Sequence, residues 1–159
     1  MSTNKVTDYF SASAALTITL NALASSTSGV GRQSTLLTGN THRRAIIYVK
    51  ITQGTSPTGN KGVYVYLLRG DAHATPHYTD GAGASDAALT ILNAVCIGTM
   101  ANKASPSTED VLYGEFVVEN MGPVWGIAIV HDTAVNLKAS DADHWVRYIY
   151  VDDDIQAAS

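Results

Sequence analysis

The 159-residue sequence has a single cysteine, Cys96, and charged residues make up only 15% of it. One cysteine excludes an internal disulfide bond and a cysteine-rich zinc site, and its apolar neighbours predict a small buried side chain. The basic residues are scattered, with Arg43 and Arg44 as the one adjacent pair, and the net charge is −4. Nucleic-acid binding needs clustered positive charge, so we expect no nucleic-acid partner.

Long hydrophobic runs are also missing. A membrane span needs about 20 consecutive apolar residues, and no run approaches that length. The opening MSTNKVTDYFSASAALTITL lacks the apolar core of a secretion signal. We therefore expect a soluble protein with no membrane partner and no export signal.

The sequence does contain short β-strand patterns separated by clusters of turn residues. Polar and apolar residues alternate with a period of two, which predicts one apolar face with Ile47, Val49 and Ile51 and another with Val63, Val65 and Leu67. β-branched and aromatic residues dominate. The segment Val124–Asp132 is apolar on both faces, which predicts a central strand. The predicted strands are Ala15–Ala22, a short segment near Arg32–Leu37, Ala45–Gln53, Gly62–Arg69, Ala94–Met100, Val111–Asn120, Val124–Asp132 and His144–Asp153. This pattern predicts an all-β antiparallel sandwich and leaves a jelly roll and an immunoglobulin-like sandwich open.

Three segments differ from this pattern. Residues 1–14 are polar and rich in Ser and Ala, which predicts a flexible N-terminal arm, and residues 154–159 are expected to be a flexible tail. Residues 15–153 then form a single domain. Residues 70–86 are predicted to form a long loop, and Ser85 is placed to cap a short helix over Asp86–Asn93.

The stretch GTSPTGNKG, Gly54 to Gly62, comes close to a phosphate-binding loop. That motif needs Lys directly after its second glycine, then Ser or Thr, then a helix. Here Asn60 separates Gly59 from Lys61, Gly62 replaces the hydroxyl residue, and a strand follows. The stretch is therefore expected to be the tip of a hairpin between Ala45–Gln53 and Gly62–Arg69.

No catalytic pattern emerges from the remaining polar residues. His73 and His77 lie in a loop with Pro76 between them, so we expect surface histidines and no metal or other cofactor. No Ser occupies a G-x-S-x-G elbow. Glu115 and Glu119 are expected on one solvated strand face, and the Arg69–Asp71 tripeptide RGD is interpreted as a chance match. We therefore expect that the protein is not an enzyme.

The aromatic residues allow two interpretations. Tyr48, Tyr64 and Tyr66 are expected on corresponding faces of two adjacent strands, either packing within the sheet or forming a platform for a protein or a sugar. Trp125 and Trp145 are expected in the core.

Three segments together resemble small head structural proteins of tailed bacteriophages. They are ALTITLNALASSTSGVGRQST, KITQGTSPTGNKGVYVYLL and GPVWGIAIVHDTAVNLKAS, and with their spacing they cover roughly residues 15–151. The resemblance implies a jelly-roll-like capsid decoration, or cement, protein. Such proteins bind the outside of the expanded head, often as dimers or trimers, and clamp neighbouring capsid subunits. The family gives no catalytic residues to carry over.

Our first hypothesis is therefore a virion protein, assembled in the host cytoplasm, whose partner is the major capsid protein and which forms a homo-oligomer. The alternatives are a glycan- or host-binding head-fibre or tail module and, as the weakest, a small β-sandwich enzyme. The candidate partner-binding residues are Thr3, Asn4, Lys5, Val6, Tyr9, Phe10, Lys61, Tyr64 and Tyr66.

Overall fold

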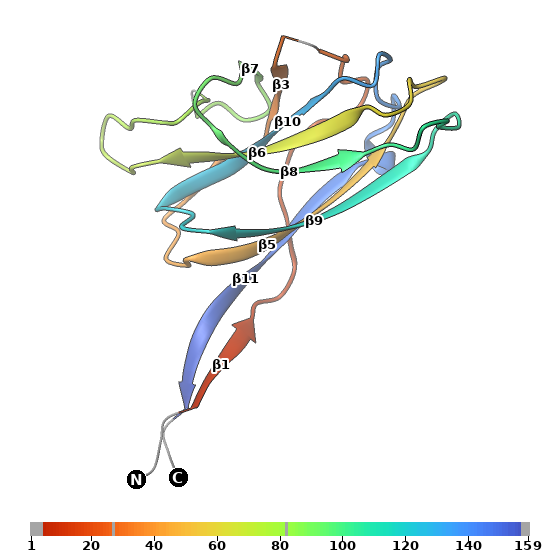
Figure 1. Cartoon of the computed structure of the whole chain (residues 1–159). Helices are drawn as coiled ribbons and strands as arrows, with labels where there is room; N and C mark the ends of the chain where they lie inside the picture. The colour runs from red at the N-terminus through yellow and green to blue at the C-terminus, as the bar shows by residue number, and fades with distance from the viewer. Residues whose placement is uncertain (1–4, 27, 82, 157–159) are drawn as a thin grey trace.

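Two antiparallel β-sheets pack face to face in a sandwich (Figure 1). The computed structural model describes residues 5–26, 28–81 and 83–156. Sheet A contains β1 (Lys5–Phe10), β2 (Ala14–Ala15), β5 (Arg44–Thr52), β9 (Val111–Glu119) and β11 (Trp145–Gln156). Sheet B contains β3 (Val30–Gln33), β4 (Leu37–Thr38), β6 (Gly62–Gly70), β7 (Ala88–Thr90), β8 (Val95–Ala101) and β10 (Val124–His131).

The strand order identifies the sandwich as a jelly roll. Sheet A has the order β1-β11-β5-β9, with β2 also on β11, and sheet B has β7-β3-β10-β6-β8, with β4 also on β10. The chain crosses between the sheets from β2 to β3, β4 to β5, β5 to β6, β8 to β9, β9 to β10 and β10 to β11. This interleaving of two antiparallel sheets is the jelly-roll arrangement, so the predicted all-β jelly-roll-like sandwich is confirmed.

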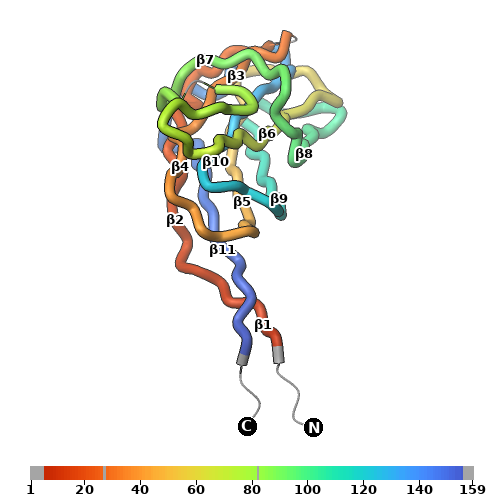
Figure 2. The backbone as a smooth tube through the Cα atoms, turned by 90° about the vertical axis from the view of Figure 1, so that its left-hand side faces the viewer, coloured from red at the N-terminus to blue at the C-terminus, as the bar shows by residue number. Residues whose placement is uncertain are grey.

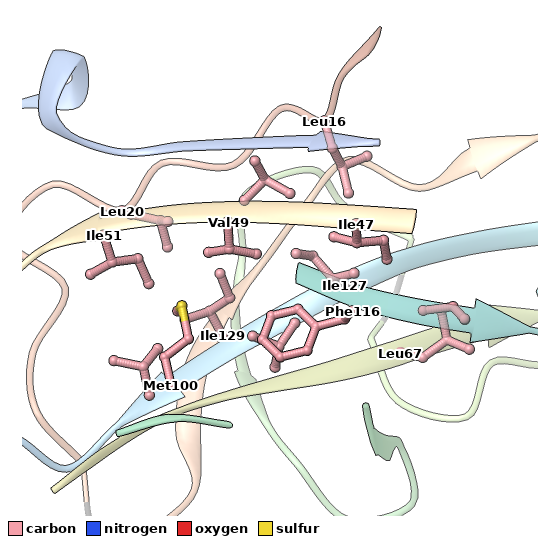
Figure 3. Close-up of a cluster of buried hydrophobic side chains, with 14 of the residues drawn as sticks. Leu16, Leu20, Ile47, Val49, Ile51, Leu67, Met100, Phe116, Ile127 and Ile129 are labelled. Carbon is pink, nitrogen blue, oxygen red and sulfur yellow. The ribbon is translucent and has the colours of Figure 1, made fainter. Parts of the chain in front are cut away.

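Strand β10 lies in the middle of sheet B, and all of its residues are buried. Its Ile127 and Ile129 face Ile47 and Val49 of β5 across the core (Figure 3). Trp125 of the same strand is fully buried and meets the ring of Tyr148 edge-on at 5.1 Å. The strand β10 is therefore central, as its apolar sequence predicted, and it is apolar on both faces because both faces are buried.

The segment after β2 shows that a period-two pattern does not always make a strand. The alternation of Ala15–Ala22 placed Leu16, Ile18 and Leu20 on one face; Leu16 and Leu20 are buried and Ile18 is partly buried, but only Ala14–Ala15 pair as a strand. The Leu16 N–H donates to Val146 of sheet A, while the Thr17 carbonyl accepts from Thr35 beside sheet B. The segment thus spans both sheets along one side of the sandwich, and the predicted strand over Ala15–Ala22 is wrong.

Three further expectations are corrected. Residues 86–93 form a turn and β7 in place of a helix. One Asp80 carboxylate oxygen accepts N–H groups from Leu92, Asn93 and Ala94, so the backbone there is fixed by a side chain. Cys96 is exposed on the edge strand β8. Trp145 is only partly buried, because it lies on the outer face of sheet A.

The stretch Gly54–Gly62 connects the two sheets, so the predicted hairpin is wrong. Its preceding strand β5 pairs with β9 and β11, and the following β6 pairs with β8 and β10. The buried Asn102 amide donates to the Gln53 side chain and the Thr58 carbonyl, and its oxygen accepts the Lys61 N–H. A Cβ on Gly59 would overlap the Ala104 carbonyl oxygen. Close approach between loops therefore requires the glycine.

A buried histidine at the end of β10 makes folding sensitive to pH. His131 is fully buried, with Nε2 2.9 Å from the Leu23 carbonyl oxygen and Nδ1 2.9 Å from the Thr133 hydroxyl. Burial lowers the pKa of His131 below its ordinary value. Because the unfolded chain then binds the proton more readily, His131 stabilises the fold above about pH 6.5, and this contribution is lost as the pH falls.

We therefore expect the free energy of unfolding to fall between pH 7.5 and 5.5 by about 1 kcal/mol more in the wild-type protein than in His131→Gln. Urea unfolding at both pH values measures the difference. The other histidines are common to both proteins and cancel in the comparison. An equal pH dependence in both would contradict the assignment.

Candidate functional site

A two-stranded ribbon projects from the sandwich and is its most distinctive external feature (Figures 1 and 2). Strand β11 pairs with β5 as far as Val151, and from Val151 to Gln156 it pairs with β1. We call residues 5–10 and 151–156 the terminal ribbon. Both views show it leaving one end of the sandwich. An isolated two-stranded pair is marginally stable in water, so such a ribbon needs support.

The ribbon corrects the expectation of an unpatterned arm and tail. Residues 5–10 form β1, and β11 continues through residues 154–156. Lys5, one of the predicted partner-binding residues, pairs through its backbone with Gln156. Thr3 and Asn4 lie outside the described residues.

Register sets the two faces of the ribbon. Val6 lies opposite Ile155, Asp8 opposite Asp153, and Phe10 opposite Val151. Directly opposed residues of antiparallel strands share a face, so these three pairs lie on one side. Tyr9 lies on the other side, opposite Asp152.

Arg44 holds the root of the ribbon by neutralising opposed acidic side chains. Asp8 and Asp153 are paired across the strands, and like charges in this position repel. Arg44 Nη2 lies 3.0 Å from Asp8 Oδ1 and also pairs with Asp153. The hydrogen bond to Asp8, reinforced by the charge of Asp153, raises the pKa of Arg44 above its ordinary value. The arginine thus links the first residue of β5 to both strands of the ribbon.

A second set of contacts fixes the opposite face of the root. His42 Nδ1 lies 2.7 Å from Asp152 Oδ2, and the imidazole stacks on Tyr150 with ring centroids 3.8 Å apart. Ser11 exchanges hydrogen bonds with Tyr150, donating its N–H to the carbonyl and accepting the Tyr150 N–H on its hydroxyl. Asn40 ties the adjoining loop to the Gly122 carbonyl oxygen. The root is therefore rigidly attached to the body.

The ribbon exposes large apolar side chains along its whole length. The exposed fractions are 60% for Val6, 67% for Ile155, 60% for Tyr9 and 53% for Phe10. Val6 and Ile155 form an apolar pair toward the tip. Side chains of this kind, gathered on a projecting element, mark an interaction site.

A cleft of about 460 Å³ opens at the root of the ribbon. Its lining carries charges of both signs and comprises Thr41, Arg43, Arg44, Glu119, Asn120, Val151, Asp152 and Asp153. Ribbon and cleft together combine an apolar projection with a polar recess, an arrangement suited to binding a protein surface.

The other predicted partner-binding residues lie elsewhere. Lys61 is in the loop before β6, at the end of the sandwich opposite the ribbon, and its Nζ lies 3.7 Å from Asp132 Oδ2. Tyr64 and Tyr66 are half-buried on the outer face of sheet B. Tyr48 belongs to sheet A. The tyrosines therefore do not form a single platform, and the prediction that they lie on adjacent strands is wrong.

The side chain of Asp71 organises the loop that carries His73 and His77. Among the described residues, no three His, Cys, Asp or Glu gather where they could hold a metal ion. His73 and His77 are exposed, and the carboxylate of Asp71 in the RGD tripeptide accepts both of their backbone N–H groups. Both hydrogen bonds lower the pKa of Asp71 below its ordinary value, and the bond from His73 has the larger effect. No helix in the described part of the chain is long and apolar enough to cross a membrane.

Comparison with known proteins adds no relative. No family model, no curated protein and no solved structure matches this chain.

Replacing Arg44 by Ala should loosen the ribbon while the sandwich stays folded, because Asp8 and Asp153 then face each other uncompensated. We expect hydrogen exchange of the amides in residues 6–10 and 152–155 to become several-fold faster, and high salt to reduce the difference from wild type. Arg43→Ala, which changes the neighbouring exposed arginine, serves as the control. Unchanged exchange in Arg44→Ala would show that the ribbon does not depend on this ion pair.

Proposed function

We propose that this protein is a bacteriophage capsid decoration protein that binds the outside of the head and cements neighbouring major capsid subunits. The observation that carries the proposal is the terminal ribbon, an apolar projection held rigidly at one end of a jelly-roll body. The resemblance of three sequence segments to phage head proteins suggests which partner the ribbon meets.

The ribbon has the properties that a clamp requires. The ribbon extends away from one end of the sandwich, so a protein surface at that end can contact both faces of the ribbon. Its apolar pair Val6 and Ile155 would lose exposed area on docking, which favours binding by roughly 1.5–3 kcal/mol for each fully buried side chain. A shell presents many copies of the same site with its subunits already held in place, so modest contacts accumulate.

The cleft at the root adds a polar contact. Arg43 places a positive charge and Glu119 a negative charge in the cleft beside the terminal ribbon. Charges of both signs favour one orientation on the partner over others. We therefore assign the ribbon end of the molecule to the shell, and the loops around Lys61 and Lys138 at the opposite end to the solvent.

Purified protein should bind expanded, undecorated capsids made from the major capsid protein encoded with it, and should raise their resistance to heat and low ionic strength. The double substitution Val6→Ser and Ile155→Ser should weaken binding at least about 30-fold, since it removes roughly 2 kcal/mol or more of apolar contact. Fluorescent protein titrated onto capsids and separated by sedimentation measures the affinity.

Leu92→Ser is the matched control, because Leu92 is equally apolar and 78% exposed but lies in a loop of sheet B. It should bind like wild type. Failure of the wild-type protein to bind any capsid form would refute the function. Full binding by the double variant would refute the role of the ribbon.

A further inference from the structure

The outer face of sheet A is a second surface with unusual composition. Beyond the row Glu119–Arg44–Val151 at the root of the ribbon, its side chains point away from the core in three rows across the strands β9, β5 and β11. The rows are Val117–Ile46–Ile149, Glu115–Tyr48–Arg147 and Tyr113–Lys50–Trp145. Val117 is 65% exposed and Tyr113 68% exposed, so the face presents apolar and aromatic groups to solvent.

The acidic and basic side chains of this face lie on different strands. Glu115 lies on β9 and Arg147 on β11, with Tyr48 between them in the same row. The Arg147 guanidinium lies 4.7 Å from the centre of the Trp145 ring. Neither Glu115 nor Arg147 makes an ion pair within the described part of the chain. The face therefore has an acid on one side and a base on the other, both without a partner of opposite charge.

We propose that two copies of this chain pack through the outer face of sheet A, about a two-fold axis parallel to β5. Such an axis brings β9 of one copy over β11 of the other, because the second sheet is turned over. Glu115 then faces Arg147 of the second copy, and the reverse contact is formed at the same time. Val117 meets Ile149 in the same way, and Tyr113 meets Trp145.

The charge pattern distinguishes this axis from the perpendicular one. A two-fold axis running across the strands would bring Glu115 of one copy against Glu115 of the other, and Arg147 against Arg147. Both contacts would be repulsive. The parallel axis brings the two Lys50 side chains near each other, but each is long enough to reach Glu115 of the other copy one row away.

The parallel axis also has a consequence for the ribbons. It preserves the direction along the strands, so both terminal ribbons project from the same end of the dimer. Two ribbons side by side suit attachment to one surface. The dimer is expected in solution, whether or not the protein binds capsids.

Sedimentation equilibrium of the full chain tests the proposal. Wild type should have twice the chain mass of 16.8 kDa at micromolar concentration. Glu115→Arg and Arg147→Glu should each weaken dimerisation at least about tenfold, since each replaces two attractive contacts by two repulsive ones. The double variant Glu115→Arg/Arg147→Glu should recover most of the affinity, because the pairs form again with their signs exchanged.

Arg43→Glu provides the control, since it reverses an exposed charge away from the outer face and should leave the dimer unchanged. Circular dichroism verifies that each variant is folded, as expected for exposed positions. A monomeric wild type, a dimer indifferent to both single changes, or a double variant no better than the singles would each overturn the proposal. Failure of capsid binding would leave this result unaffected, so the two proposals are tested separately.

Discussion

The structure depends on a change of partner along one strand. β11 pairs with β5 inside the sandwich and with β1 beyond it, and Val151 pairs with both. Because a single continuous strand belongs to body and ribbon, the direction of the ribbon is fixed by the twist and register of sheet A. A slip of one residue would exchange the faces of every side chain in the ribbon. Arg44 acts at the same point, since its backbone pairs with Val151 and its side chain holds Asp8 and Asp153.

The outer face of sheet A continues into one face of the ribbon through the same register. Ile149 is followed by Val151, Asp153 and Ile155 on that side. The surface nevertheless divides into two parts with different chemistry. In the body, charges of opposite sign lie on different strands, which suits pairing with a second copy. In the ribbon, Arg44 already satisfies the acidic pair, which leaves an apolar tip for another protein. The two proposals therefore use neighbouring parts of one sheet without competing for the same side chains.

Sequence alone predicted which side chains face the core better than it predicted how strands pair. Alternation correctly marked Ile47, Val49 and Val65 as buried, and the unbroken apolar run correctly marked β10 as central. The same alternation arises whether β5 and β6 form a hairpin or lie in opposite sheets, so the hairpin and the joint tyrosine face were wrong. The ribbon was missed because neither KVTDYF nor VDDDIQ alternates regularly between polar and apolar residues. Their pairing also depends on Arg44, which is 36 residues from Asp8 and 109 from Asp153. Val6, Tyr9 and Phe10 were predicted as partner-binding residues, and the structure places them on the exposed ribbon; binding itself stays a prediction.

The central claim is that the ribbon end of the molecule, and not the opposite end, meets the capsid. Hydrogen–deuterium exchange compared between free protein and protein attached to capsids tests it most directly. We predict new protection in residues 6–10 and 151–155 and at the cleft around Arg43, with the loops at 53–61 and 132–140 unchanged. Protection confined to those two loops, with the ribbon exchanging as in the free protein, would contradict it.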